Sequence, residues 1–275
     1  MTILVTGATG TVGRQVVDQL QRAGQRVRAL TRNPAKANLP DGVEVVGGDL
    51  AAPETLGHAL DGVTGVHLIT FGGDDYATLQ AAPEILELAT KAGVRRVTVL
   101  MGGERGPVEE AVEASDLEWT LLQPVEFMAN TLEWAESIRG EGIVREAFGD
   151  MLSAMVHEAD IGAVAATVLS EDGHGGRTYT LTGPEALTVP QKVRTIGAAI
   201  GRDIRFVELT EAQARARWRE SGYPDEAIDF FVFVSRDTPP VGYTVVPTVE
   251  QVTGRAPRSF AQWAAEHADA FRVDL

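Results

Sequence analysis

The feature that most constrains the fold of this chain is a glycine-rich turn between an apolar segment and an amphipathic one. Residues 3–13 read ILVTGATGTVG, with Gly7, Gly10 and Gly13 at regular spacing. Such glycines permit a tight turn, let the backbone approach a pyrophosphate and let the following helix pack on the strand. The helix N-terminus then directs its N–H groups at the phosphates. The context favours a dinucleotide site over a turn without a ligand. The expected phosphate-binding residues are Gly7, Thr9, Gly10, Thr11, Val12 and Gly13.

The end of the second predicted strand, at 26–31, bears on which dinucleotide would bind. Folds that take NAD usually have an acid here, which accepts hydrogen bonds from the ribose 2′-OH. This chain has Thr31 followed by Arg32. A guanidinium can bind a 2′-phosphate with paired donors, whereas an acid would repel it; Arg14 and Lys36 could add positive charge. NADP(H) is therefore favoured over NAD(H), and the alternative is that Arg32 is only an exposed surface cation.

Composition excludes several classes of function. The net charge of −15 argues against nucleic acid or an anionic membrane surface as the main partner. The absence of cysteine excludes disulfides, thiolate catalysis and zinc–thiolate sites. The first predicted strand begins at residue 2, and no apolar run approaches membrane-spanning length. We therefore expect a cytoplasmic protein, a monomer or homodimer, whose partner is a small molecule rather than nucleic acid or a membrane.

Strand and helix patterns alternate through the first half of the chain, which predicts a parallel sheet covered on both faces. Right-handed crossovers then give a Rossmann-like, doubly wound α/β fold with ligands at the carboxyl ends of the strands. The expected strands are 2–6, 26–31, 43–46, 65–70, 95–100, 118–122 and 177–183, and the expected helices are 12–23, 53–60, 76–92, 107–114 and 159–170. Thr188 and Thr210 are expected to cap two further helices. We expect a dinucleotide-binding domain over 1–150, with elements returning from about 158–183, and a smaller substrate lobe over 184–275.

In combination, several segments resemble the NmrA-like group of atypical short-chain dehydrogenases/reductases, near the NAD(P)H:quinone oxidoreductase type. The matching segments are ILVTGATGTVG at the start, ALTRNP after the second strand, VVGGDL at 45–50, ASDLEWTLLQPVEFMAN at 114–130, HEADIGAVAATVL at 157–169, GRTYTLTGPEALT at 176–188 and TGRAPRSFAQWAAEHADAF near the end. The resemblance spans essentially the whole chain and implies an NADP(H)-dependent oxidoreductase. The further residues that it places at the cofactor are Thr31, Arg32, Asp49, Leu50, Thr70, Phe71, Gly72, Met101, Gly102, Pro124 and Phe127.

The chain departs from this superfamily in its proton-transfer residues. Typical members use Tyr-x-x-x-Lys, with a nearby serine or threonine, to protonate a carbonyl oxygen. None of the four tyrosines here, at 76, 179, 223 and 243, is followed four residues later by lysine. Two explanations stay open. The protein reduces a quinone or an aromatic ketone that takes its proton from solvent or from its own phenol, or it binds NADP(H) without turnover as a redox sensor of the NmrA type.

The substrate would then meet an apolar slot with few polar groups, which suits a flat aromatic molecule. The candidates for this slot are Phe127, Met128, Asn130, Phe148, Met151 and Met155, with space for a ring beside Gly72 and Gly73 and further aromatic side chains at Trp218, Phe230, Phe231 and Phe233. His157 is the best titratable candidate for a proton donor, although a hydrogen-bonded histidine at a strand end fits equally. We expect Glu104 and Glu126 to be solvated. The histidines show no metal-ligand spacing.

Overall fold

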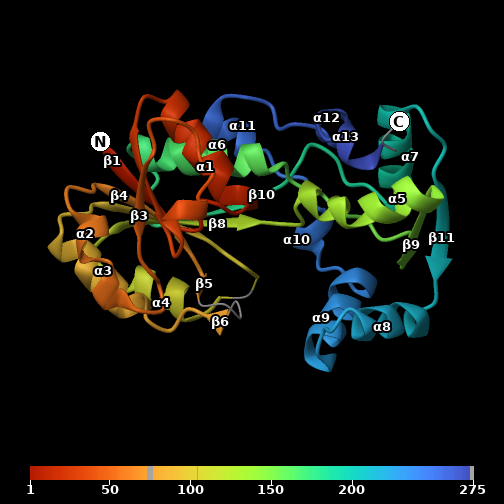
Figure 1. The fold of residues 1–275 in the computed structure, drawn as a ribbon, viewed down its shortest axis with the longest axis horizontal. Helices are drawn as coiled ribbons and strands as arrows, with labels where there is room; N and C mark the ends of the chain where they lie inside the picture. The colour runs from red at the N-terminus through yellow and green to blue at the C-terminus, as the bar shows by residue number, and fades with distance from the viewer. Residues whose placement is uncertain (73–76, 104, 273–275) are drawn as a thin grey trace. The chain divides into compact units, whose positions relative to one another are not determined.

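The computed structural model describes residues 1–72, 77–103 and 105–272 and divides the chain into two compact units (Figure 1). Unit 1 comprises Met1–Pro124, Glu158–Leu181 and Thr248–Arg255. Unit 2 comprises Val125–His157, Thr182–Pro247 and Ala256–Leu275. The first boundary thus lies at Pro124 rather than near residue 150, because the segment after Pro124 contributes its apolar side chains to the core of unit 2.

Unit 1 is built on a seven-stranded parallel sheet in the order β10-β8-β7-β4-β1-β2-β3. The strands are β1 (Thr2–Val5), β2 (Arg26–Thr31), β3 (Glu44–Gly47), β4 (Gly65–Ile69), β7 (Arg96–Leu100), β8 (Glu118–Pro124) and β10 (Arg177–Leu181). The strand order reverses between β1 and β4, which is where an open α/β sheet binds its ligand, beyond the carboxyl ends of the strands. This arrangement confirms the predicted doubly wound fold.

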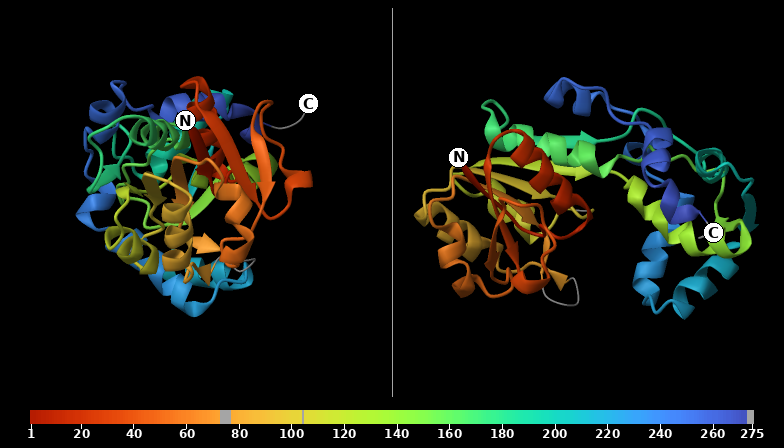
Figure 2. Two further views of the ribbon diagram at one scale, coloured as in Figure 1. Left: turned by 90° about the vertical axis from the view of Figure 1, so that its left-hand side faces the viewer. Right: turned by 45° about the horizontal axis from the view of Figure 1, so that its top comes forward.

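Helices cover both faces of this sheet (Figure 1). One face carries α1 (Thr11–Arg22), α6 (Glu158–Ser170) and α11 (Thr248–Thr253); the other carries α2 (Gly57–Leu60), α3 (Ala82–Lys91) and α4 (Pro107–Glu113). Figure 2 shows α1, in red, beside α6, in green. The two helices are so close that a Cβ on Gly162 would lie 2.7 Å from the backbone carbonyl carbon of Gln15. α6 therefore packs closely along α1 on this face of the sheet.

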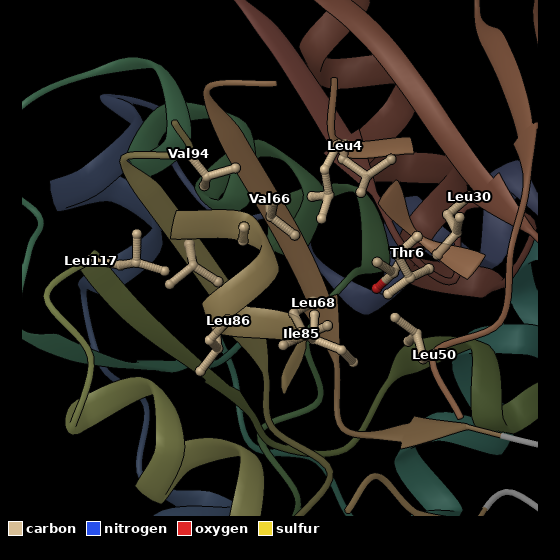
Figure 3. Close-up of a pocket in the computed structure, with 14 residues that line it drawn as sticks. Leu4, Thr6, Leu30, Leu50, Val66, Leu68, Ile85, Leu86, Val94 and Leu117 are labelled. Carbon is tan, nitrogen blue, oxygen red and sulfur yellow. The ribbon is translucent and has the colours of Figure 1, made fainter. Parts of the chain in front are cut away.

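The apolar core between the sheet and α2, α3 and α4 contains a small cavity of about 10 Å³ (Figure 3). Its lining is apolar apart from Thr6 and includes Leu4, Val66, Leu68, Ile85 and Leu86. A cavity needs about 10–15 Å³ of such space to hold one water molecule, so this one has no room for a ligand. We regard it as a gap in core packing.

His67, in β4, is the one histidine of the described residues that lies fully inside the sheet. Its Nδ1 lies 2.8 Å from Thr98 Oγ1, and its Nε2 has no hydrogen-bond partner among the described residues. Burial lowers the pKa of His67 to about 4, because the interior disfavours the charged ring. The imidazole is therefore neutral at pH 7 and acts as a packing residue.

Unit 2 is mostly helical and contains a parallel pair of strands, β9 (Ile143–Ala147) and β11 (Arg205–Leu209). Its other elements are η3 (Met128–Trp134), α5 (Ala135–Glu141), α7 (Val189–Ile200), α8 (Glu211–Glu220), α9 (Asp225–Arg236), α10 (Pro240–Tyr243), α12 (Phe260–Glu266) and α13 (Ala268–Phe271). Phe260 and Trp263 of α12 stack on each other in its core. The predicted caps are confirmed: Thr188 and Thr210 accept the N–H groups of Gln191 and Gln213.

Two helices of the first half differ from prediction. The helix expected at 76–92 begins at Ala82, because a short hairpin of β5 (Phe71–Gly72) and β6 (Ala77–Thr78) comes before it. The helix expected at 53–60 is a 3-10 turn, η2 (Pro53–Thr55), followed by α2. In both cases the helix between two strands of the sheet is shorter than predicted.

Candidate functional site

The glycine-rich turn needs each of its glycines for a separate reason. Gly7 has a φ of +59°, a conformation that glycine adopts at little cost, and its carbonyl accepts the N–H of Gly10 at 2.9 Å. A Cβ on Gly13 would lie 2.0 Å from that same carbonyl oxygen, so the helix reaches its position only with glycine there. At Gly10 a Cβ would meet only that oxygen, at 3.2 Å, and would otherwise enter open space. The turn therefore leaves a cradle above Gly10.

The N-terminus of α1 is not capped by a side chain, since its N-cap residue is Gly10. The first N–H groups of a helix have no partner within the helix, so those of Thr11, Val12 and Gly13 remain as donors. By contrast, α7, α8 and α12 each have a threonine or serine side chain that accepts an N–H of their first turn. Thr9, Gly10 and Thr11 are exposed. The cradle thus presents N–H donors and a positive dipole end, which fit a pyrophosphate.

The loops that follow β4 and β7 lie beside this turn at the carboxyl edge of the sheet. The Thr6 hydroxyl accepts the N–H of Ile69 at 3.0 Å, and the Ile69 side chain lies 3.0 Å from where a Cβ of Gly7 would be. A Cβ on Gly102 would lie 2.8 Å from the Phe71 ring and 3.2 Å from the Thr70 hydroxyl. The structure therefore brings together the predicted residues of both loops.

The loop after β3 joins the same edge. A Cβ on Gly72 would lie 3.5 Å from the N of Ala51 and 3.7 Å from Leu50. Local hydrogen bonds hold Asp49: its N–H donates to the Thr55 hydroxyl, and its carboxylate accepts the N–H of Ala51 at 2.9 Å. Leu50 is buried in the core, and so is Met101. Leu50 and Met101 can therefore contact a ligand through their backbone atoms, but their side chains expose little surface.

The segment after β2 carries positive charge and no acid. Thr31 Oγ1 accepts the N–H of Asn33 at 3.2 Å, while Arg32 and Lys36 are exposed. Arg14 donates from Nε to the Thr9 carbonyl at 2.9 Å and from Nη1 to the Asn38 carbonyl. Arg14 therefore ties the glycine-rich turn to the segment that follows Arg32, and residues 32–40 contain no Asp or Glu.

In unit 2, the segment after Pro124 holds the predicted substrate residues in two different environments. Phe127 pairs with Val156, and the flanking bonds are Val156 N–H to the Glu126 carbonyl and Met128 N–H to the Val156 carbonyl. Phe127, Phe148 and Met151 are half-buried, and Asn130 is exposed. Met128 and Met155 are 1 % and 2 % exposed and belong to the core of unit 2. Their burial gives them a packing role instead of a surface for substrate.

His157 is placed away from solvent. It is 3 % exposed, and its Nε2 lies 3.2 Å from the carboxylate of Glu266 on α12. The structure thus shows the second of the two expected settings, a hydrogen-bonded histidine next to the start of α6. A role as proton donor stays a prediction.

The sequence reasoning missed a polar network in unit 2. Lys192 on α7 is 4 % exposed, and its Nζ lies 2.9 Å from the carboxylate of Glu126. The Ser153 hydroxyl donates to the same carboxylate oxygen at 2.5 Å. Glu126 is thus both partly solvated, with 37 % of its side chain exposed, and paired, because the buried Lys192 ammonium requires a partner. The sequence does contain a signal for this pair. Lys192 lies on the same helix face as Val189 and Ile196, and burying a lysine there without a partner would cost free energy of folding.

The aromatic side chains of α8 and α9 form a cluster of their own. The Phe231 ring packs edge-on against Trp218 and Tyr223, at 5.5 and 5.1 Å between centroids, while Phe230 and Phe233 are each about half exposed. Gly73, Tyr76 and Glu104, named from the sequence, lie outside the described residues. Within the described part of the chain, no cluster of acidic or histidine side chains could hold a metal ion, and no helix is long and apolar enough to cross a membrane.

Comparison with known proteins agrees with this geometry. An NAD(P)H-binding family model matches residues 7–106. The (4-alkanoyl-5-oxo-2,5-dihydrofuran-3-yl)methyl phosphate reductase of Streptomyces griseus is 39 % identical, and the match covers 98 % of this chain and 99 % of that protein. The NAD(P)H azoreductase of Xenophilus azovorans is 36 % identical with the same coverage. The structure of an NADPH-dependent quinone oxidoreductase from Escherichia coli, complexed with NADPH, superposes with a TM-score of 0.80 at 26 % identity and covers 96 % of this chain and 99 % of that one.

Proposed function

This chain belongs to the NmrA-like group of atypical short-chain dehydrogenases/reductases, a family of NAD(P)H-dependent oxidoreductases, and we propose that it is an NADPH-dependent reductase of a quinone or an aromatic ketone. The observation that carries the proposal is the uncapped start of α1 above Gly10, with the loops after β3, β4 and β7 at the same sheet edge. Reduction is proposed to proceed without a Tyr-x-x-x-Lys acid, which the sequence lacks.

The dinucleotide fits the donor groups on this edge. The N–H groups of Thr11, Val12 and Gly13 would bind the pyrophosphate, and Arg32 would bind the ribose 2′-phosphate. Asp49 would lie at the adenosine end, and the loops of Thr70 and Gly102 at the nicotinamide end. NADPH, when bound, supplies the hydride. The chain's own residues then have to orient a flat acceptor and exclude water around it.

The chemistry of the acceptor decides whether a protein acid is needed. Hydride addition to a quinone leaves an oxyanion stabilised by the new aromatic ring, and water can protonate it. A ketone beside a phenol can take its proton from that phenol. General acid catalysis contributes about 10²–10⁴-fold, so an acceptor of this kind can be turned over without it. The azo, quinone and unsaturated-lactone groups in the names of the relatives are all conjugated, which supports this class of acceptor.

Arg32→Ala should weaken NADPH binding by about 1.5–3 kcal/mol, the scale of a hydrogen bond to a charged group, and leave NADH binding nearly unchanged. The reason is that only NADPH carries the 2′-phosphate. Calorimetric titration with both dinucleotides measures the difference. Arg26→Ala is a matched control, because Arg26 is an exposed arginine at the opposite end of β2. Equal affinity of the unmodified protein for NADPH and NADH would contradict the proposed selectivity.

The proposed reaction is tested by NADPH oxidation with a panel of quinones, aromatic ketones, azo dyes and acyl butenolides. Replacing each tyrosine in turn by phenylalanine should change kcat by less than about tenfold, well short of the loss of a general acid. His157→Ala should stay within the same limit when solvent or the substrate supplies the proton. A loss of 100-fold or more in kcat, with NADPH binding intact, would instead identify His157 as the proton donor.

The same panel separates the reductase from the redox sensor. A protein that binds NADP(H), reduces no acceptor and binds a protein partner more tightly in one redox state of the nucleotide would be a sensor. That result would refute the proposed function.

A further inference from the structure

Phe148 has an unusual backbone conformation. Its φ is +55°, and among the described residues it is the only non-glycine with a positive φ; the other twelve such positions are all glycines. In this left-handed region the Cβ of an L-residue approaches the following carbonyl oxygen, so a bulky residue there is strained. Glycine would occupy the position without this strain, but the chain places an aromatic residue there.

Neighbouring elements impose the conformation from several directions. The Met151 N–H donates to the Phe148 carbonyl at 3.1 Å, which closes a tight turn. The Gly149 N–H donates to the Glu208 carboxylate on β11 at 3.2 Å, and the Gly149 carbonyl accepts the N–H of Val189 at the start of α7. A Cβ on Gly149 would lie 2.7 Å from the Phe206 ring, so the backbone passes directly against that ring. The strained turn is therefore fixed by its surroundings.

Packing in the core of unit 2 does not explain why an aromatic side chain is at position 148. It is half-buried, and it is absent from the cluster of Phe260, Trp263 and their neighbours that forms this core. Among the described residues no other aromatic ring stacks on it, unlike the rings of α9 and α12. Residues kept in strained conformations that surrounding structure enforces concentrate at ligand-binding sites.

The turn is also tied to the proposed substrate residues of unit 2. From Met151 the chain continues to Ser153, which bonds to Glu126, and to Val156, which pairs with Phe127. The start of α7 carries both Val189, bonded to Gly149, and Lys192, bonded to Glu126. Phe148 and Phe127 thus belong to one rigid network of hydrogen bonds.

We propose that Phe148 is a specificity-determining residue whose ring, held by this strained turn, is the surface on which the flat ring of the substrate stacks. The inference rests on the proposed reduction of a flat aromatic acceptor and names the residue that selects it. Rigid placement matters because a Phe148 side chain that is already ordered loses little conformational freedom when the substrate binds to it. The selected class is fused or extended aromatic acceptors, which offer the larger stacking face.

The strain is tested by comparing Phe148→Gly with Phe148→Ala. Both variants lack the ring, but only alanine keeps a Cβ, so the comparison isolates the backbone. Phe148→Gly should unfold about 2–4 °C higher than Phe148→Ala in thermal melts. Equal melting temperatures would overturn the claim that the turn is strained.

The role of the ring is tested by binding. With oxidised NADP⁺ present, the dissociation constant for 1,4-naphthoquinone should rise at least tenfold in Phe148→Gly and Phe148→Ala. It should rise less for 1,4-benzoquinone, and it should stay within about threefold in Phe148→Tyr. The affinity for NADPH should not change in any variant. Unchanged naphthoquinone affinity in both ring-deleted variants, or no binding by the unmodified protein, would refute the inference. Binding of quinones without their reduction would refute the proposed function and leave this inference standing.

Discussion

Gly10→Val should raise the dissociation constant for NADPH by at least about 100-fold, or about 2.7 kcal/mol, and leave the protein folded. A Cβ at this position meets only the Gly7 carbonyl oxygen, at 3.2 Å, so the added side chain points into the open cradle above α1. That space is where the pyrophosphate would approach the helix N-terminus. The cost to folding should be only about 1 kcal/mol, since valine is a poor N-cap residue. Calorimetry measures binding, and circular dichroism checks the fold.

Two further glycine variants make this result interpretable. Gly57→Val adds the same side chain at the start of α2, where nothing lies within 4 Å, and should leave NADPH binding unchanged. Gly13→Ala is the opposite case, because its Cβ would lie 2.0 Å from the Gly7 carbonyl oxygen, and it should disrupt the packing of α1. Wild-type affinity in a folded Gly10→Val protein would show that the dinucleotide binds elsewhere.

Glu126→Gln should destabilise unit 2 by about 2–3 kcal/mol, because it leaves the Lys192 ammonium buried without its counter-charge. The Lys192 side chain is 5 % exposed, and that of Glu126 is 37 % exposed, so water can compensate the carboxylate but not the ammonium. Lys192→Met should therefore cost less, about 1 kcal/mol, and the double variant about the same as Lys192→Met alone. Urea unfolding at pH 7, followed by fluorescence and circular dichroism, measures the cycle.

The exposed pair of Lys91 and Glu87 is the matched control for this cycle. Both of its side chains are about two-thirds exposed, and its Nζ–carboxylate distance is 2.5 Å. Glu87→Gln should leave stability unchanged within error, because solvent screens an exposed pair. If the costs of Glu126→Gln and Lys192→Met simply add in the double variant, the buried pair has no coupling and the prediction fails.

The sequence predicts the dinucleotide-binding half well because its signals are local. Gly7, Gly10 and Gly13 fall within seven residues, and each parallel strand is a short apolar run followed by an amphipathic helix. These patterns depend on neighbours along the chain, so they identify the doubly wound parallel sheet and the carboxyl edge at which its ligand binds. The comparisons confirm the family and the NAD(P)H-binding domain.

The second unit was less predictable because its determinants are distant in sequence. β9 and β11 are five residues each and pair across about 60 residues, so neither has a pattern that identifies its partner. Glu126 and Lys192 lie 66 residues apart. Met128 and Met155 neighbour the expected substrate turn in sequence, but tertiary packing turns both into the core. The left-handed conformation of Phe148 was not predictable either, because glycine is the residue that usually indicates such a conformation.

The alternation of the two units along the chain has a consequence for how the protein is made. Unit 1 is composed of three separate segments, and its last segment, Thr248–Arg255, follows more than 120 residues after Pro124. A ribosome adds residues in order, at about 5–20 per second. The glycine-rich turn and its neighbouring loops are complete early, but β10 and α11 reach the nascent domain much later. Neither unit can be excised as one continuous piece of chain, so truncation at Pro124 would remove an edge strand and two covering helices from the sheet rather than release a finished domain.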